Sequence, residues 1–196
     1  MSNRRVVLLL AAFVVGAVAI VASALALLPS GRGTVSNEVA IGGPFQLVDQ
    51  NGTAVTQDSY LGRPTLVFFG FTHCPDICPT ALFEMSQLFE ALGPDASKAT
   101  GLFITVDPER DTPEVMKSYL GSFHPSIQGL GGTPEQTAAV TRAYRAYAKK
   151  VPTQGGDYTM DHTAIVYLMD KNGRFVAPFN LKRPPEDAAA ELRRYF

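Results

Sequence analysis

The chain has 196 residues, with 17 lysines and arginines, 18 aspartates and glutamates, two cysteines, three histidines and no tryptophan. Binding to a nucleic-acid backbone needs a basic excess that this near-neutral chain lacks, so we expect no nucleic-acid partner. With 46% hydrophobic and 18% charged residues, the chain is too apolar to be mainly disordered. Two cysteines also exclude a disulfide framework and a four-cysteine zinc site.

Apolar residues are concentrated at the N-terminus. Val6–Leu28 is a run of 23 residues without a charged side chain, and it follows Arg4 and Arg5. A helix of about 20 apolar residues crosses the hydrocarbon layer of a membrane, and basic residues before it favour a cytoplasmic N-terminus. A cleaved signal peptide is the alternative, although its apolar region is usually about 7–15 residues long. We therefore predict that residues 1–28 form a transmembrane anchor, in effect an uncleaved signal, and that the remainder is exported.

The exported part begins with a linker. Residues 29–43 are rich in glycine, serine, proline and threonine, which is typical of a flexible tether. We expect residues 44–196 to form one domain, which is long enough to bury a sizeable core. Its first element is a β-hairpin of Phe45–Val48 and Ala54–Thr56, because the Asn51-Gly52 pair between them is a strong hairpin-turn signal.

The first half of the domain then alternates between strand and helix. Thr65–Phe71 contains four consecutive large apolar residues, which is typical of a central strand buried on both faces. The next helix is predicted to have Pro79 at its first position and to end before Gly93. Leu102–Val106 has the same apolar character and predicts a second buried strand.

The second half contains helices that begin at proline residues. In Thr112-Pro113 the threonine is an expected N-cap. Thr133-Pro134 repeats this arrangement and forms a capping box with Gln136, and we expect this helix to continue to Ala148.

The domain is predicted to end with a β-hairpin and a helix. The hairpin consists of Thr163–Met169 and Arg174–Pro178, and the helix begins at Pro185. Alternating strands and helices followed by this hairpin predict an α/β sandwich with a mixed central sheet. The order matches a thioredoxin-like architecture with an N-terminal β-hairpin extension, preceded by one transmembrane helix.

Both cysteines lie between the first buried strand and the helix that follows it. Exposed amides and the positive end of the helix dipole favour the thiolate forms of Cys74 and Cys78, and thiolates both attack disulfides and bind metals. Thioredoxin-type catalysts have two intervening residues, whereas the three residues here let both sulfurs face one ion without forbidding a disulfide. Buried structural cysteines or a structural disulfide are the simpler alternatives.

His162 lies directly before the strand that opens the terminal hairpin. In a thioredoxin topology this loop packs against the cysteine turn, and catalytic thioredoxins have a cis-proline there. The sequence has no proline between Pro152 and Pro178, so a candidate metal ligand replaces this redox element. A loop histidine with a satisfied hydrogen bond is the alternative. His73 adjoins Cys74 on a strand end and is expected to point away, in a structural role or supporting the ligands. His124 is expected at the surface with no partner nearby.

Cys74, Cys78 and His162 would form a soft site with three ligands. Thiolates favour Cu(I), and imidazole suits both oxidation states of copper. Structural zinc normally takes a fourth protein ligand, and iron–sulfur clusters take four thiolates. The donor set therefore predicts copper, as Cu(I) or Cu(II).

Three separated motifs resemble the Sco/SenC family. They are Phe71–Thr80 (FTHCPDICPT), Val106–Pro113 (VDPERDTP) and Asp161–Ala164 (DHTA), and the likeness covers about residues 41–195. The resemblance implies a thioredoxin-like, membrane-anchored protein that binds one copper ion and assists assembly of cytochrome c oxidase, chiefly the dinuclear copper centre of subunit II. The implied ligands are Cys74, Cys78 and His162.

The resemblance leaves two functions open. One is a copper metallochaperone, which is not an enzyme, with an upstream periplasmic copper chaperone as its supplier. The other is a membrane-tethered thiol–disulfide oxidoreductase that reduces the cysteines of the copper-receiving site, in which Cys74 attacks and Cys78 resolves.

The two aspartates of the second motif have a different expected role. Asp107 and Asp111 fit loop-shaping or partner-contacting residues and are not assigned as ligands. The N-terminus leaves no room for a mitochondrial transit peptide before Val6. We therefore expect a single-pass protein of a bacterial inner membrane, with a cytoplasmic N-terminus and a periplasmic C-terminal domain.

Overall fold

A computed structural model describes residues 13, 14, 16–18, 23 and 40–196. Most of the predicted anchor (1–28) and of the predicted linker (29–43) lies outside these residues. Within the described part of the chain, no helix combines the length and the apolar character needed to cross a membrane. The residues from 40 onward contain all the elements that position the candidate site.

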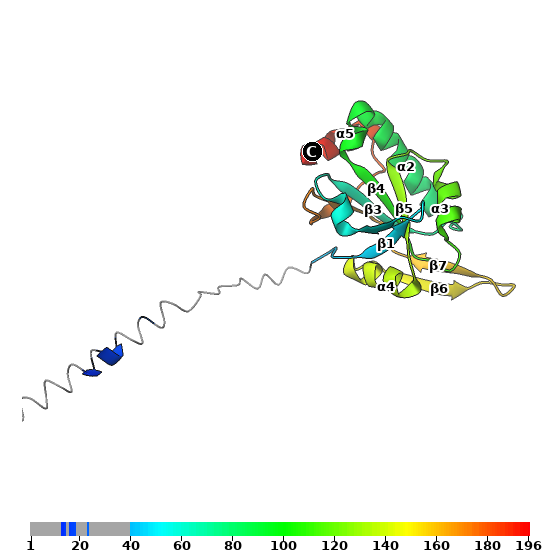
Figure 1. The fold of residues 1–196 in the computed structure, drawn as a ribbon. Coiled ribbons are helices and arrows are strands. Elements are labelled where there is room, and N and C mark those ends of the chain that lie inside the picture. Colours follow the sequence, from blue (N-terminus) through cyan, green and yellow to red (C-terminus); the bar gives the residue numbers. More distant parts are fainter. Residues whose placement is uncertain (1–12, 15, 19–22, 24–39) are drawn as a thin grey trace, which may run out of the picture. The chain divides into compact units, whose positions relative to one another are not determined.

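Seven strands form a mixed sheet with the order β2-β1-β5-β4-β3-β8-β9 (Figure 1). Their bounds are β1 Gln46–Asp49, β2 Ala54–Thr56, β3 Thr65–Gly70, β4 Thr100–Thr105, β5 Ile127–Gly131, β8 Val166–Met169 and β9 Phe175–Phe179. Strands β3, β4 and β5 are parallel to one another. On one side β8 pairs antiparallel with β3, and β9 with β8. On the other side β1 pairs antiparallel with β5, and β2 with β1. The predicted mixed sheet and N-terminal hairpin are thus confirmed.

The centre of the sheet is fully buried. Every residue of β3 and of β4 is buried, as their uninterrupted apolar sequences predict. The two strands are in register from Thr65 opposite Thr100 to Gly70 opposite Thr105. Their carboxyl ends therefore lie together at one edge of the sheet, where open α/β folds place their ligands.

Four helices cover the sheet, and three of them begin as predicted. Their bounds are α2 Ile77–Leu92, α3 Pro113–Leu120, α4 Pro134–Ala143 and α5 Pro185–Leu192, with short 3-10 turns at Gln57–Tyr60, Gly93–Lys98 and Arg193–Tyr195. Thr112 caps α3 by accepting a hydrogen bond from the Val115 amide, and Thr133 and Gln136 form the predicted capping box of α4. The exception is α2, which begins at Ile77 and not at Pro79, so Cys78 lies within its first turn.

The two faces of the sheet carry different helices. Helices α2 and α3 cover the face to which Phe103 of β4 points. The ring of Tyr119 from α3 lies 5.9 Å from the Phe103 ring, and Met85 of α2 lies directly over Gly101 on the same face. Helix α5 packs against α2 (Figure 1). On the opposite face, Tyr144 at the end of α4 contacts the ring of Phe69 at 5.4 Å. This arrangement is the predicted α/β sandwich.

Residues 144–162 differ from the prediction. Helix α4 ends at Ala143 and does not reach Ala148, because Arg145 adopts a left-handed conformation with φ of 51°. The chain then forms a hairpin of β6 (Ala148–Pro152) and β7 (Tyr158–His162), which make a separate two-stranded sheet. Strand β5 was likewise not expected as a strand.

The burial of the central sheet predicts a large difference between two phenylalanines. Phe68→Ala should lower the free energy of unfolding by about 3–5 kcal/mol, because the Phe68 ring is 0% exposed. Phe83→Ala, on the outer surface of α2 at 58% exposure, is the matched control and should change it by less than about 0.5 kcal/mol. Urea unfolding of both purified variants measures these values, and equal losses would contradict the described core.

Candidate metal centre

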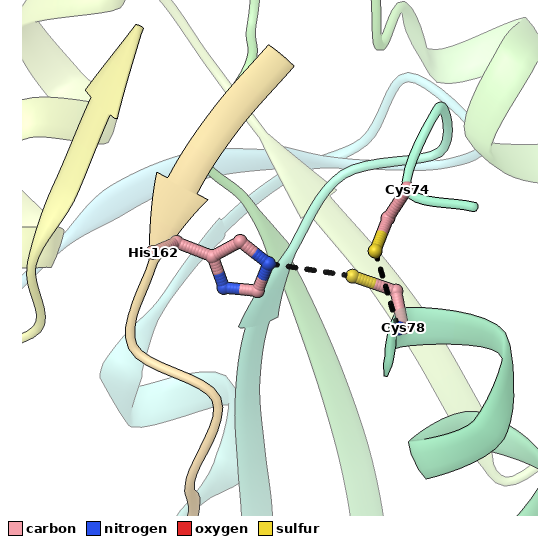
Figure 2. Close-up of side chains that lie close together, drawn as sticks. All are labelled: Cys74, Cys78 and His162. Carbon is pink, nitrogen blue, oxygen red and sulfur yellow. Dashed lines mark hydrogen bonds between the residues drawn. The ribbon is translucent and has the colours of Figure 1, made fainter. Parts of the chain in front are cut away.

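The three predicted ligands come together at the carboxyl end of β3 (Figure 2). Cys74 lies in the loop after β3, Cys78 in the first turn of α2, and His162 is the last residue of β7. Two adjoining segments thus supply the two sulfurs, and a strand 84 residues beyond Cys78 supplies the imidazole. The structure differs from the prediction in one detail, since His162 ends a strand and does not lie in the loop before one.

The donor atoms are close enough to share one ion. The two sulfurs and the imidazole nitrogen all lie within 4.8 Å of one another, and Cys78 Sγ is 3.6 Å from His162 Nε2. Ligand atoms at about 2.0–2.3 Å from a common metal are roughly 3.8 Å apart in a trigonal arrangement. Small side-chain rotations therefore suffice to bring all three onto one ion.

The two thiols differ in their surroundings. Both are free, but Cys78 is fully buried, whereas Cys74 is partly exposed. Burial raises the pKa of the Cys78 thiol well above its ordinary value, so this group keeps its proton in the metal-free protein at neutral pH. The Cys74 sulfur lies at the N-terminus of α2 and accepts a hydrogen bond of 3.4 Å from the Cys78 amide.

Gly70 makes room for the Cys78 sulfur. A Cβ atom at this last residue of β3 would lie 2.8 Å from Cys78 Sγ and 2.6 Å from the ring of Phe103. A side chain here would push the first turn of α2 away from the sheet. The absence of a side chain at Gly70 therefore lets the buried thiol pack directly on the central strand.

The His162 ring is held in one orientation. Its Nδ1 atom lies 3.1 Å from the carbonyl oxygen of Thr163, which can only accept a hydrogen bond, so Nδ1 carries the proton. Edge-on contacts with the rings of Phe71 at 5.7 Å and Phe68 at 6.3 Å restrict the imidazole further. Nε2 is thereby left as the acceptor that faces Cys78 and can bind a metal.

Asp111 holds the cysteine loop and lies outside the group of three donor residues. Its carboxylate is fully buried and accepts hydrogen bonds from the Thr72 amide (3.1 Å), the Thr72 hydroxyl (2.6 Å) and the Thr105 hydroxyl (2.6 Å). This bond pattern ties the segment before Cys74 to the end of β4. The expected loop-shaping role of Asp111 is what the structure shows.

The other two histidines lie outside the donor group of the described residues, and His124 is a partly buried residue with partners, not the surface residue without one that the sequence predicts. His73 is half-exposed, and its Nδ1 is 3.1 Å from the Thr72 hydroxyl. His124 stacks on Phe89 with 5.4 Å between ring centroids, and its Nδ1 accepts a hydrogen bond from the Ser126 amide. Neither joins the group of donor atoms among the described residues.

Tyr119 is a neighbour of the cysteines that sequence reasoning did not single out. Its hydroxyl is buried and has no hydrogen-bond partner among the residues that the structure describes. Burial raises the pKa of this hydroxyl, and electrostatic interactions with Cys78, Cys74 and Asp111 raise it further. The phenol therefore stays protonated beside the thiols, and no local sequence pattern signals its position on α3.

Comparisons with known proteins agree over most of the chain. The sequence model of the SCO1/SenC family matches residues 33–196. An SCO2-like protein of Rickettsia prowazekii is 43% identical over 147 residues, which cover 74% of this chain and 72% of that relative.

Solved structures give the same result for the fold. The structure of Bradyrhizobium japonicum ScoI with copper bound is 66% identical, with a TM-score of 0.79 over 80% of this chain and 100% of that chain. The structure of Arabidopsis thaliana ScoI with copper bound is 37% identical, with a TM-score of 0.73 and the same coverage. Because the family model spans most of the sequence and these relatives align over most of their own length, the chain belongs to the SCO1/SenC family.

Proposed function

We propose that this protein binds one copper ion through Cys74, Cys78 and His162 and delivers it to cytochrome c oxidase, at the dinuclear copper centre of subunit II. The observation that carries the proposal is the group of two sulfurs and one imidazole nitrogen within 4.8 Å of one another. Family membership supports it, as do the copper-bound structures of the Bradyrhizobium and Arabidopsis relatives.

The chemistry of the donor set favours copper over other metals. Two thiolates bind Cu(I) strongly, and the imidazole adds a third donor that suits either oxidation state. Zinc in a structural site would normally take a fourth protein ligand, and the group of donors in the described residues has three members. A site with three ligands and a partly exposed edge also allows incoming donors to attach before the original ones leave.

Release of the ion then proceeds by ligand exchange. Cys74 and His162 are both partly exposed, so a thiolate or imidazole of the receiving protein can reach an ion held between them. Each incoming donor replaces one of the three ligands, and the metal remains coordinated throughout. An upstream periplasmic copper chaperone is the proposed supplier of the ion.

We also propose that the protein is a single-pass protein of a bacterial inner membrane. The proposal rests on the sequence: an uncharged run of 23 residues follows Arg4 and Arg5. Residues 1–28 would anchor the chain with its N-terminus in the cytoplasm, residues 29–43 would form a linker, and residues 44–196 would be the periplasmic copper-binding domain.

A second candidate function is reduction of the cysteines in the copper-receiving site. The observation in its favour is the unequal exposure of two adjacent free thiols. The Cys74 thiolate would attack a target disulfide and form a mixed disulfide, and the Cys78 thiolate would then displace the target's second sulfur. The target gains two electrons and two protons, and this protein ends with a Cys74–Cys78 disulfide.

His162→Ala tests the three-ligand site. The reduced wild-type protein should bind one equivalent of Cu(II), and the variant's affinity should fall by at least about 100-fold, because loss of an outer-shell partner alone costs roughly 10- to 100-fold. His124→Ala removes a histidine outside the donor group and should leave the affinity and the thiolate-to-copper absorption bands unchanged. A His162→Ala variant with wild-type affinity and spectrum would show that the histidine is not a ligand.

Copper affinity should also depend on pH. Burial raises the pKa of the Cys78 thiol, so Cu(I) must displace a proton from it at neutral pH. Each displaced proton weakens apparent binding about tenfold per unit of decreasing pH. Competition with a Cu(I) chelator between pH 6 and 8, with the chelator's own protonation corrected, measures the slope, and a pH-independent affinity would contradict thiolate ligation by Cys78.

A disulfide-reduction assay separates the two candidate functions. Metal-free protein should reduce a generic disulfide substrate slowly, and one equivalent of Cu(I) should abolish the remaining activity, because copper occupies both thiolates. Rapid turnover that His162→Ala leaves unchanged would favour the oxidoreductase instead. Cys78→Ser is the control, since it removes the resolving thiol of the oxidoreductase and one of the three donors of the copper site.

A further inference from the structure

The strand that carries His162 is not part of the main sheet. Strand β7 pairs only with β6, from Tyr158 opposite Pro152 to His162 opposite Ala148. Among the described residues, no backbone-to-backbone hydrogen bond joins this hairpin to the seven-stranded sheet. The short chain link from His162 to Val166 of β8 and the side-chain contacts of the hairpin therefore set the distance between His162 and the two cysteines.

The turn after β4 provides several of these contacts, first of all through Arg110. The guanidinium donates a hydrogen bond of 3.0 Å to the carbonyl oxygen of Tyr158 and lies 3.8 Å over the ring of the same residue. On its other side it donates to the Asp107 carboxylate at 2.5 Å. Arg110 thus binds the backbone of β7 and its first side chain at the same time.

Two neighbours of Arg110 strengthen the connection. The Tyr158 hydroxyl donates to the buried Asp107 carboxylate at 2.9 Å. Glu109 pairs with Lys150 of β6 at 2.7 Å, and the Lys150 ammonium lies 4.0 Å from the centre of the Tyr158 ring. Three residues of one turn therefore contact both strands of the hairpin.

The same turn also holds the cysteine segment. Asp111 follows Arg110 directly, and its carboxylate accepts hydrogen bonds from the amide and the hydroxyl of Thr72, two residues before Cys74. Arg110 is also 5.9 Å from the ring of Phe71, which contacts the His162 ring. Adjacent side chains in one turn thus hold the two segments that carry the donors.

We propose that residues 107–111 form a clamp that fixes the separation of His162 from Cys74 and Cys78, with Arg110 and Tyr158 as positioning residues for the histidine. Neither residue touches the donor atoms, and both act through the placement of β7. This inference rests on the proposed function, because the consequence of the placement is the affinity for a metal that uses all three donors.

The burial of Arg110 supports a role in positioning His162 and not only in stabilising the fold. Its side chain is 19% exposed, and its Nη2 atom is buried without a hydrogen-bond partner among the described residues. An unpaired buried donor costs free energy, and apolar packing often stabilises a fold as well as a buried ion pair does. The guanidinium is instead suited to orienting β7, since its planar group of donors holds the Asp107 carboxylate and the Tyr158 carbonyl at fixed angles to each other.

The clamp predicts different effects on two metal ions. Cu(I) forms stable two-coordinate complexes with a pair of thiolates, so it depends little on the position of His162. Co(II) needs the third donor, and its visible spectrum reports the ligands, while its oxidation state does not change on addition to thiols. A displaced hairpin should therefore weaken Co(II) binding much more than Cu(I) binding.

The test uses Arg110→Gln, which removes the guanidinium, and Tyr158→Leu, which removes the aromatic ring beneath it. Each should weaken Co(II) binding about tenfold, the lower end of the effect of losing an outer-shell partner, and should change Cu(I) affinity by less than about threefold. The double variant should lose less than the sum of the two single losses, because both changes remove the contact between the guanidinium and the Tyr158 ring. Faster hydrogen exchange at the amides of β7 should accompany the loss.

Arg174→Gln is the matched control. Arg174 also forms hydrogen bonds with an aspartate, Asp170, but it lies in the terminal hairpin turn, and its replacement should leave both affinities unchanged.

If the wild-type protein binds neither ion, the proposed function itself is wrong. If the wild type binds both, and Arg110→Gln and Tyr158→Leu keep the wild-type Co(II) affinity and spectrum, the clamp is wrong. Equal losses for Cu(I) and Co(II) in both variants would also overturn it, since they would indicate general unfolding of the site.

Discussion

The buried carboxylate of Asp111 is the interaction on which the arrangement of the site depends. It lies between the ends of β3 and β4 and receives three hydrogen bonds, two from Thr72 and one from Thr105. A carboxylate without such partners would be costly to bury, whereas charge-assisted bonds offset the loss of water. The segment leading to Cys74 therefore departs from the sheet along one path, and α2 can begin early enough to bring Cys78 into its first turn.

Sequence reasoning located the cysteine half of the site because its signals are local. Strand β3 ends at Gly70, four residues before Cys74, and a helix begins at Ile77, so both thiols had to lie at the carboxyl end of a buried strand. Threonine caps at Thr112 and Thr133 were equally local and are confirmed. Only the first residue of α2 was misplaced, since Pro79 is compatible with any position in the first turn of a helix.

The histidine half was less accessible because its structure depends on distant contacts. Strand β6 contains Lys149 and Lys150, both exposed, and lacks the apolar alternation that predicts a strand. The end of α4 gave no signal either, since an arginine and not a glycine takes the left-handed conformation at position 145. His162 was recognised as a candidate ligand, but the hairpin that carries it, and the turn that holds this hairpin, could be identified only from the structure.

The close packing of Cys78 on Gly70 has a consequence for movement within the site. The sulfur of Cys78 has β3 directly behind it, with no side chain between that could yield. When a bond between the two sulfurs forms or opens, the two residues therefore cannot move by equal amounts. The displacement falls on the segment from His73 to Asp76, between the Thr72 that Asp111 holds and the first turn of α2 that stays fixed against the sheet. Oxidation and metal exchange would thus change the conformation of one short, exposed loop and leave the helix behind it in place.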